Sequence, residues 1–266
     1  MDRGTRMLSG KTALITGSSL GIGYTVAAKL ASLGCNVVMN GIEAAADIGP
    51  KATALADAHV VQAVYESCDV GDGAALDALC ARTLDRFGAI DIVVNNAVMR
   101  VFGAIEDTDP ADWEKAISVN LNAAFRTTHH ALPGMKERGW GRIINMSSIY
   151  GTIGAVNRAS YVTSKTALIG LTRATALEVA KHEITCNAVA PGAVRATNAD
   201  NAIRALMETH GIDEDEAVRR FLDGKQPSGR FAAPESVAEM VVFLCGPAGR
   251  DINGAVLPID NAWSAS

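Results

Sequence analysis

The sequence lacks several features that mark other classes of protein. It has no CxxC pair, and its five cysteines are dispersed, a pattern typical of reduced core thiols rather than a disulfide framework or a zinc site. No apolar run approaches the roughly 20 residues that a membrane span needs. The first ten residues, MDRGTRMLSG, contain no apolar segment like that of a secretory signal. We therefore expect a cytoplasmic protein with no bound metal and no membrane partner.

A basic cluster is missing as well. The chain has 24 Lys and Arg against 29 Asp and Glu, a net charge of -5, whereas binding to nucleic-acid phosphates needs clustered positive charge. This excludes a general nucleic-acid binder. The 266 residues suffice for one large core, and no repeat or linker divides them. We expect a single domain over residues 1–266 that is an enzyme or a small-molecule binder.

Short apolar runs alternate with amphipathic segments along most of the chain. The predicted strands are Thr12–Ile15, Asn36–Met39, Val60–Tyr65, Asp91–Val94, Arg142–Asn145, Ile184–Val189 and Ala255–Ile259. The predicted helices include Ile22–Leu33, Ala74–Phe87, Ala111–Arg138, Ser160–Lys181 and Pro234–Cys245. Nearly continuous apolar strands belong to a parallel sheet that is covered on both faces. The pattern predicts an α/β fold with a doubly wound parallel sheet, the Rossmann fold.

The alternation stops between Pro191 and Pro234. Two helical segments, roughly Asn198–Thr209 and Asp213–Leu222, follow each other there with no strand between them. An insertion at this point lies over the carboxyl ends of the strands, where such folds bind ligands. We interpret residues 193–230 as a small helical substrate lid; an ordinary pair of surface helices is the alternative.

A glycine-rich turn, TGSSLGIG, joins the first strand to the first helix. Gly17 allows a tight turn, Gly21 lets the backbone approach a ligand, and Gly23 lets helix and strand pack closely. The amide groups at the start of the helix would bind a pyrophosphate. Three glycines alone fit a simple turn equally well, but the strand before them and the helix after them favour a dinucleotide site.

Tyr161 and Lys165 are four residues apart on a predicted helix, so their side chains share one face. A tyrosine hydroxyl has a pKa near 10, and a neighbouring ammonium lowers it toward the range in which the group exchanges protons. Tyr161 would exchange a proton with the oxygen of a substrate alcohol. Ser148 follows the fifth strand and would hydrogen-bond that same oxygen. A tyrosine and a lysine at this spacing, with no other motif, are often just exposed side chains on a helix surface.

The order of these motifs resembles that of the short-chain dehydrogenase/reductase family over nearly the whole chain. The match comprises TGxxxGxG, Asp69, Asn95-Asn96-Ala97, Asn120 in VNLN, Ser148, Tyr161-x-x-x-Lys165 and Pro191-Gly192. The resemblance implies an oxidoreductase acting on CH–OH groups, with Asn120, Ser148, Tyr161 and Lys165 as its catalytic residues. Lys165 would also bind the nicotinamide ribose, and Asn120 would anchor a water that links the lysine to solvent.

The resemblance also implies a cofactor site. Asp69 and Val70 would contact the adenine, and Asn95 would hold the fourth strand and the ribose. The expected cofactor-binding residues are Gly17, Ser19, Leu20, Gly21, Ile22, Gly23, Asn40, Asp69, Val70, Asn95, Ala97, Tyr161, Lys165, Pro191, Gly192 and Val194. For Asp69 and Asn95 a strand end or a turn cap is the alternative role.

Charge favours NAD over NADP, because a 2′-phosphate needs a basic partner. Leu20 stands where phosphate-binding family members often place arginine, and Asn40-Gly41-Ile42 contains no lysine or arginine. The acidic residue that usually holds the ribose diol is missing at this strand end, and Glu43 follows a few positions later.

Several segments, such as Lys225-Gln226-Pro227-Ser228 and Asp260-x-x-Trp263, are similar to those of bacterial D-3-hydroxybutyrate dehydrogenases. Matching by position makes Arg100, Ser148, Tyr150, Arg158 and Trp263 the substrate-binding residues. Arginines at two of these positions suit a carboxylate, so we expect a small anionic hydroxy acid such as 3-hydroxybutyrate or a relative. Ordinary solvated arginines are the alternative.

Two other functions are possible for such a chain, and the resemblance also implies an oligomeric state. An NADPH-linked 3-oxoacyl carrier-protein reductase would need a basic ribose-phosphate site. A non-catalytic NAD(H)-binding sensor would have no use for an acid/base relay. The resemblance implies a homotetramer that assembles through the helices at Ala111–Arg138 and Ser160–Lys181.

Overall fold

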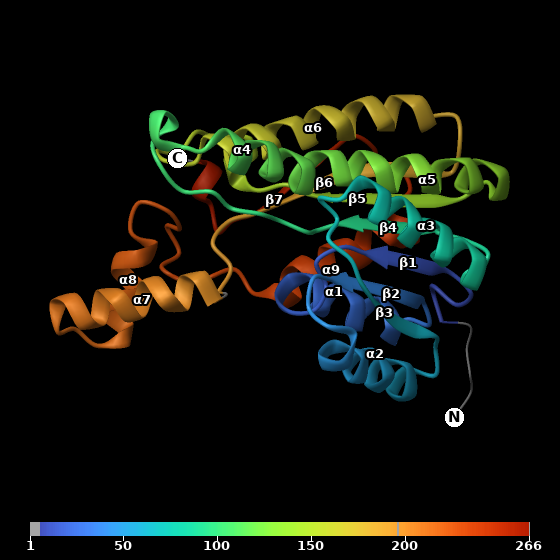
Figure 1. Cartoon of the computed structure of the whole chain (residues 1–266), viewed down its shortest axis with the longest axis horizontal. Helices are drawn as coiled ribbons and strands as arrows, with labels where there is room; N and C mark the ends of the chain where they lie inside the picture. The colour runs from blue at the N-terminus through green and yellow to red at the C-terminus, as the bar shows by residue number, and fades with distance from the viewer. Residues whose placement is uncertain (1–5, 196, 266) are drawn as a thin grey trace.

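A seven-stranded parallel sheet forms the centre of the protein. The computed structural model describes residues 6–195 and 197–265. The strand order is β3-β2-β1-β4-β5-β6-β7, with every pair parallel (Figure 1). The strands are β1 (Thr12–Ile15), β2 (Asn36–Gly41), β3 (Ala63–Ser67), β4 (Ile92–Asn95), β5 (Gly141–Met146), β6 (Ile184–Pro191) and β7 (Val256–Ile259). The doubly wound parallel fold expected from the sequence is confirmed, and it forms a single domain.

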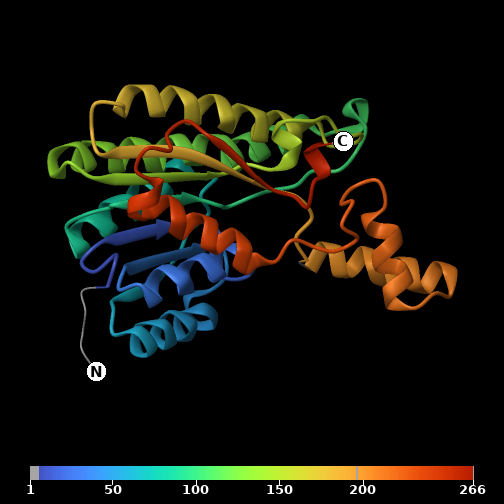
Figure 2. The same cartoon turned by 180° about the vertical axis from the view of Figure 1, so that it is seen from behind.

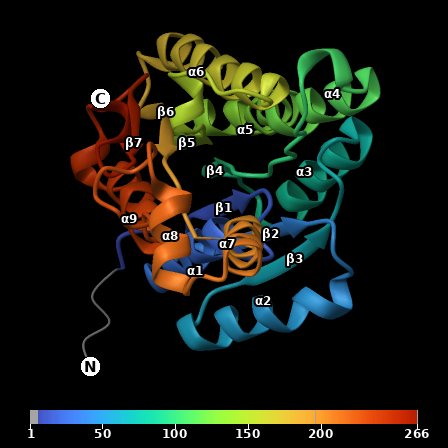
Figure 3. The ribbon, with the colours of Figure 1, turned by 90° about the vertical axis from the view of Figure 1, so that its left-hand side faces the viewer.

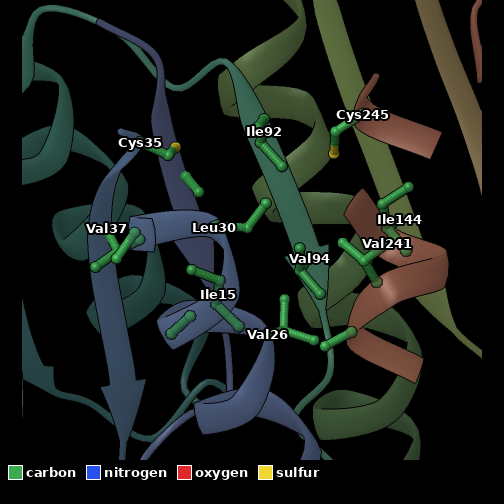
Figure 4. Packing of buried hydrophobic residues seen from close by; sticks show 14 of the residues in the cluster. Ile15, Val26, Leu30, Cys35, Val37, Ile92, Val94, Ile144, Val241 and Cys245 are labelled. Atoms are coloured by element: carbon green, nitrogen blue, oxygen red, sulfur yellow. The ribbon is translucent and has the colours of Figure 1, made fainter. Parts of the chain in front are cut away.

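Helices cover both faces of the sheet (Figure 3). One face carries α1 (Gly21–Ser32), α2 (Ala45–His59) and α9 (Pro234–Cys245), whose buried side chains join one apolar cluster with β1, β2 and β4. The other face carries α3 (Gly73–Phe87), α5 (Ala123–Arg138) and α6 (Ala159–Val179). Figure 4 shows part of the first cluster, in which Val26 and Leu30 of α1 and Val241 of α9 surround Ile15 and Val94. The strands are therefore packed between two layers of helices, which fix where their carboxyl ends lie.

The helix α2 has no counterpart among the helices expected from the sequence. Its second turn contains Gly49-Pro50, a dipeptide that usually ends a helix. Ile48, Ala52 and Leu55 nevertheless bury themselves in the core. Tertiary packing therefore outweighs the local cost of the proline.

The long helix expected over Ala111–Arg138 is interrupted. The structure has α4 (Pro110–Ile117), a π-helical turn η2 (Ser118–Asn122), and then α5. A π-helical turn contains one residue more than a regular turn, and such turns occur frequently at functional sites. Here it contains the buried Asn120.

Two helices project beyond the carboxyl ends of the strands (Figures 1 and 2). They are α7 (Thr197–His210) and α8 (Glu214–Leu222), within a residue or two of the segments expected. Ala196 lies outside the described residues. Short 3-10 turns occur at η1 (Ile105–Asp107), η3 (Ile149–Gly151), η4 (Pro247–Gly249) and η5 (Trp263–Ala265). Within residues 6–195 and 197–265, no helix combines the length and apolar character that crossing a membrane requires.

Candidate active site

Two adjoining pockets open at the carboxyl ends of the central strands, and they share Gly17, Ser19, Glu43, Ala97 and Val98. One extends over the ends of β2 and β3, and the other extends toward β5 and β6. Every cofactor residue expected from the sequence lines one of them except Asn95. Those residues are Gly17, Ser19, Leu20, Gly21, Ile22, Gly23, Asn40, Asp69, Val70, Ala97, Tyr161, Lys165, Pro191, Gly192 and Val194. The two pockets adjoin and form one cleft over the carboxyl ends of the strands.

The glycine turn is shaped by backbone contacts that a side chain would block. Gly17 has φ +60°, and a Cβ there would lie 2.7 Å from the Cα of Ala97. A Cβ on Gly23 would lie 2.4 Å from the carbonyl oxygen of Gly17. Gly21 has φ +58° and faces open space. The turn is thus packed tightly from below and left open toward the cleft, which fits a bound dinucleotide.

The start of α1 faces the same opening. Leu20 precedes the helix and offers no side-chain cap to its first amide groups. Unpaired amides at a helix start carry partial positive charge and suit a pyrophosphate. The residues present therefore fit NAD(P): the turn makes room, and the α1 amides supply the donors.

Asn95 and Asn96 point in different directions. The Asn95 amide donates to Asn145 Oδ1 at 2.8 Å, and Asn95 Oδ1 accepts from the Thr127 hydroxyl at 2.6 Å. These bonds join β4 to β5 and α5 and leave the Asn95 side chain outside both pockets. Asn96 instead lines the cleft, and its Nδ2 donates to Gly17 O at 2.7 Å. The sequence motif identified the pair but did not show which member supports the glycine turn.

The far end of the cleft, over β2 and β3, contains three hydrogen-bonded polar side chains, those of Asn40, Asp69 and Lys115. Asn40 Oδ1 accepts from the Gly17 amide at 3.4 Å, and its Nδ2 donates to Cys68 O at 3.0 Å. Asp69 pairs with Lys115 at 2.6 Å. The hydrogen bond from Lys115 holds the pKa of the Asp69 carboxyl below its usual range. Asp69 and Val70 line the pocket where the adenine was expected.

Glu43 brings an acidic side chain to the carboxyl end of β2, a strand that has no acid at its own end. Its carboxylate accepts from the Ser19 hydroxyl at 2.8 Å and from the Tyr65 hydroxyl at 3.2 Å, and it lines both pockets. Burial alone would raise the pKa of Glu43, but these hydrogen bonds lower it, so the group is ionised at neutral pH. Two residues beyond the end of β2, the chain folds this acid back over Ser19. Sequence spacing alone could not show that return.

The side chains of Tyr161, Lys165 and Ser148 meet at the other end of the cleft, and all three are buried. Lys165 Nζ lies 5.6 Å from the centroid of the Tyr161 ring. Burial alone would raise the pKa of the Tyr161 hydroxyl. The charges of Lys165 and Arg100, together with hydrogen bonds from Ser148 and Arg100, outweigh it and lower that pKa. The hydroxyl is therefore poised to take or give a proton.

Lys165 and Asn120 are held firmly in place. Lys165 Nζ donates to Met146 O at 2.6 Å, and burial lowers the pKa of its ammonium. Asn120 Oδ1 accepts from the Met99 amide at 2.7 Å, and its Nδ2 donates to Met99 O and to Ser164 Oγ. The Asn120 side chain therefore joins the chain after β4 to α6, the helix that carries Tyr161 and Lys165.

The expected substrate residues gather around Tyr161. Tyr150 packs edge-on against Tyr161, with ring centroids 6.2 Å apart, and against Trp263 at 5.3 Å. The Arg158 guanidinium carbon lies 5.5 Å from the Tyr150 ring centroid. Arg100 lies 5.5 Å from the Tyr161 ring centroid. The arrangement is a cluster of three aromatic rings with an arginine near each of the two tyrosine rings.

This fold and site define the class of protein. A family model described as enoyl-(acyl carrier protein) reductase matches residues 17–263. The chain belongs to the short-chain dehydrogenase/reductase family, as its motifs predicted, and it is an oxidoreductase acting on CH–OH groups with an NAD(P) cofactor.

Its relatives include dehydrogenases of a hydroxy acid. The D-beta-hydroxybutyrate dehydrogenase of Cupriavidus necator is 38% identical over 97% of this chain and 100% of its own length. The enzyme of the same name from Rhizobium meliloti is 35% identical over 96% and 99%. The L-sorbose reductase of Gluconobacter frateurii, solved with NADPH and L-sorbose, superposes with a TM-score of 0.92 at 29% identity, covering 99% of this chain and 100% of that one.

Proposed function

We propose that this enzyme interconverts a small anionic hydroxy acid and the corresponding oxo acid, with NAD as its cofactor. The observation that carries the proposal is the position of Tyr161, a phenol of lowered pKa, beside Lys165 and Arg100 in the cleft that the glycine turn lines. Arg100 and Arg158 lie near the rings of Tyr161 and Tyr150 and would bind the carboxylate. The D-beta-hydroxybutyrate dehydrogenase relatives support 3-hydroxybutyrate or a relative as the substrate.

Each residue has a defined task in the reaction. A bound nicotinamide supplies the hydride acceptor in oxidation and the hydride donor in reduction. In oxidation, ionised Tyr161 takes the proton of the substrate hydroxyl as the C–H bond breaks; in reduction it returns that proton to the oxygen of the new alcohol. Ser148 hydrogen-bonds the same substrate oxygen and holds it in line. Lys165 stabilises the phenolate by its charge. Asn120 fixes the chain around Met99 against α6, next to Lys165.

The acidic end of the cleft favours NAD. Glu43, held by Ser19 and Tyr65, would accept hydrogen bonds from the ribose diol and would repel a 2′-phosphate. The same contact argues against the NADPH-linked 3-oxoacyl carrier-protein reductase. The Gluconobacter frateurii relative was solved with NADPH, so the two cofactors must be compared directly.

The helical pair α7 and α8 would serve as a lid over this cleft. Residues 193–230 begin directly after Pro191 and Gly192, which line it, so movement of the pair would open or close the substrate end. We also propose a cytoplasmic homotetramer, assembled through the faces of α4–α5 and α6.

A panel of small hydroxy acids with NAD and with NADP tests the function. The purified enzyme is expected to reduce NAD with 3-hydroxybutyrate or a close relative, and to prefer NAD over NADP in kcat/KM. NADH binding, followed by its fluorescence, with no turnover of any acid would contradict the proposal and favour a non-catalytic sensor. A preference for NADP would contradict the cofactor assignment.

A further inference from the structure

Gln226 is a buried amide in a segment that is otherwise largely open to solvent. Its side chain is 3% exposed, whereas Asp223, Gly224 and the four residues that follow Gln226 are exposed. A buried amide loses its hydrogen bonds to water, so it is stable inside a protein only where protein groups replace them. The partners of Gln226 therefore show what the segment after α8 is attached to.

Both polar atoms of this amide have a partner, and the partners lie at the two ends of the proposed lid. Gln226 Oε1 accepts from the Ala193 amide at 3.0 Å, and its Nε2 donates to Arg230 O. Beside these bonds, the Ala232 amide donates to Ala193 O at 2.9 Å, and Val194 and Ala232 form a parallel bridge. Gln226 thus joins the chain that leaves β6 to the chain that returns toward α9.

Gly192 packs directly against the Gln226 side chain. A Cβ on Gly192 would lie 2.6 Å from Gln226 Oε1 and 2.9 Å from the Cα of Asp260. The Gly192 amide donates to Ile259 O at 3.0 Å, which ties the same residue to β7. The Gln226 oxygen and the chain at the end of β7 therefore fix where the Gly192 backbone lies.

The stretch that Gln226 holds is a wall of the catalytic end of the cleft. Gly192 and Val194 line the same pocket as Tyr161, and Gln226 lines neither cleft pocket. A nicotinamide ring that exchanges a hydride must lie at this end, because Tyr161 and the ring act on the same C–OH group. A misplacement of about 1 Å can cost roughly 100-fold in rate. The position of this wall therefore matters for the chemistry.

We propose that Gln226 is a positioning residue for hydride transfer: it holds Gly192 and Ala193 where they support the nicotinamide half of the cofactor, without touching the cofactor itself. The inference rests on the proposed function for the place of the nicotinamide ring. Without the amide, the Ala193 N–H and the Arg230 carbonyl lose a partner, and the two ends of the lid are joined by fewer bonds. The wall then loosens, while the glycine turn and the end of β2 keep their own contacts.

NADH and ADP-ribose differ by the nicotinamide ring, so their affinities separate a local effect from a general loss of stability. Gln226→Met replaces the amide by an apolar side chain of similar length. We expect its NADH dissociation constant to rise on the order of tenfold, because two buried polar groups lose their partner. ADP-ribose should bind within about twofold of the parent affinity. Calorimetry measures both ligands.

Asn187 offers a matched control on β6, the strand that leads into the same wall. This buried amide also accepts one bond and donates one: its Oδ1 accepts from the Ala255 amide at 3.0 Å, and its Nδ2 donates to Ile252 O at 2.6 Å. It lines neither cleft pocket. Asn187→Leu should lower the melting temperature but leave the ratio of NADH to ADP-ribose affinity unchanged. An equal change of this ratio in both variants would overturn the inference, as would a parent-like ratio in Gln226→Met.

Two further variants keep the test decisive if Gln226→Met does not fold. Gln226→Ala leaves room for water to reach the Ala193 amide and the Arg230 carbonyl, but it removes the link between them, so the affinity ratio should still fall. Gln226→Glu keeps an oxygen for the Ala193 amide and should retain more NADH affinity than Gln226→Ala. Equal ratios in Gln226→Ala and the parent would contradict the positioning role.

No hydroxy acid enters these binding measurements, which keeps the two proposals separate. Lack of turnover of every hydroxy acid would count against the proposed function, and the ratio of NADH to ADP-ribose affinity would still decide the role of Gln226. Turnover by the parent enzyme with a parent-like ratio in the Gln226 variants would retain the proposed function and refute the inference.

Discussion

The Arg100 guanidinium lies 5.5 Å from the centroid of the Tyr161 ring, so the phenol stands near two cations rather than one. Lys165 approaches from the same helix, and Arg100 approaches from the chain after β4. Both charges favour the ionised phenol. Under the proposed function Arg100 would therefore have two tasks that experiments can separate: it would bind the substrate acid, and it lowers the pKa of Tyr161.

Replacing Arg100 should shift the pH profile. Because Arg100 lowers the pKa of Tyr161, Arg100→Gln raises that pKa. Oxidation needs the ionised phenol, so the rise of kcat/KM with pH should move to higher pH in the variant. Arg100→Lys keeps the charge and should stay closer to the parent enzyme. Rates measured from about pH 6 to about pH 10 cover the transition, and superimposable profiles for the Arg100→Gln and parent enzymes would refute this role.

Tyr161→Phe should remove proton transfer while leaving the cleft intact. We expect kcat to fall by roughly 10²- to 10⁴-fold, with NADH affinity nearly unchanged because the ring and its packing remain. Tyr24→Phe is the matched control, since Tyr24 lies on α1 and lines neither pocket. Stopped-flow or steady-state absorbance of the nicotinamide measures both. Full turnover by the Tyr161→Phe enzyme would end the assignment of Tyr161.

Neutralising Glu43 should relax cofactor choice. Glu43→Gln removes the negative charge beside Ser19, and the ratio of kcat/KM for NADP over NAD should rise on the order of tenfold, equivalent to about 1.4 kcal/mol. Asp47→Asn removes an exposed acid from the first turn of α2, outside both pockets, and should leave the ratio unchanged. An equal ratio in the Glu43→Gln and parent enzymes would place cofactor selection elsewhere.

A methyl group at Gly23 should damage both stability and cofactor binding. The added Cβ would meet Gly17 O at 2.4 Å and Asn96 Nδ2 at 2.6 Å, and such overpacking typically costs about 1–3 kcal/mol. Gly23→Ala should therefore lower the melting temperature and weaken NADH binding. Gly49→Ala on α2 meets no atom within 4 Å and should stabilise slightly, by up to about 1 kcal/mol. If the Gly23→Ala variant melts and binds like the parent, the close packing is not needed.

The sequence predicted most of the architecture because buried parallel strands leave a strong apolar signal. Thr12–Ile15 and Pro234–Cys245 match β1 and α9 at both ends. The α2 helix was missed, since Gly49-Pro50 signals a break locally and only the core contacts of Ile48, Ala52 and Leu55 show why the helix continues.

Motifs placed residues along the chain but did not give side-chain directions. Asn95 and Asn96 are adjacent, yet one joins two strands and the other supports the glycine turn. Glu43 was too far past its strand to be assigned, and the return of the chain over Ser19 brings it into the cleft.

The π-helical turn between α4 and α5 couples two properties: which face of α5 is buried, and where the Asn120 side chain points. A regular helix would leave the two independent. Each residue advances a helix by about 100°, so one surplus position rotates all of α5 relative to α4. Ala123, Thr127 and Ala131 are buried in the rotated phase, and Asn120 turns toward Met99 in the same stretch. Deleting a single residue there would turn the buried face of α5 away from the sheet, which makes this stretch intolerant of length change.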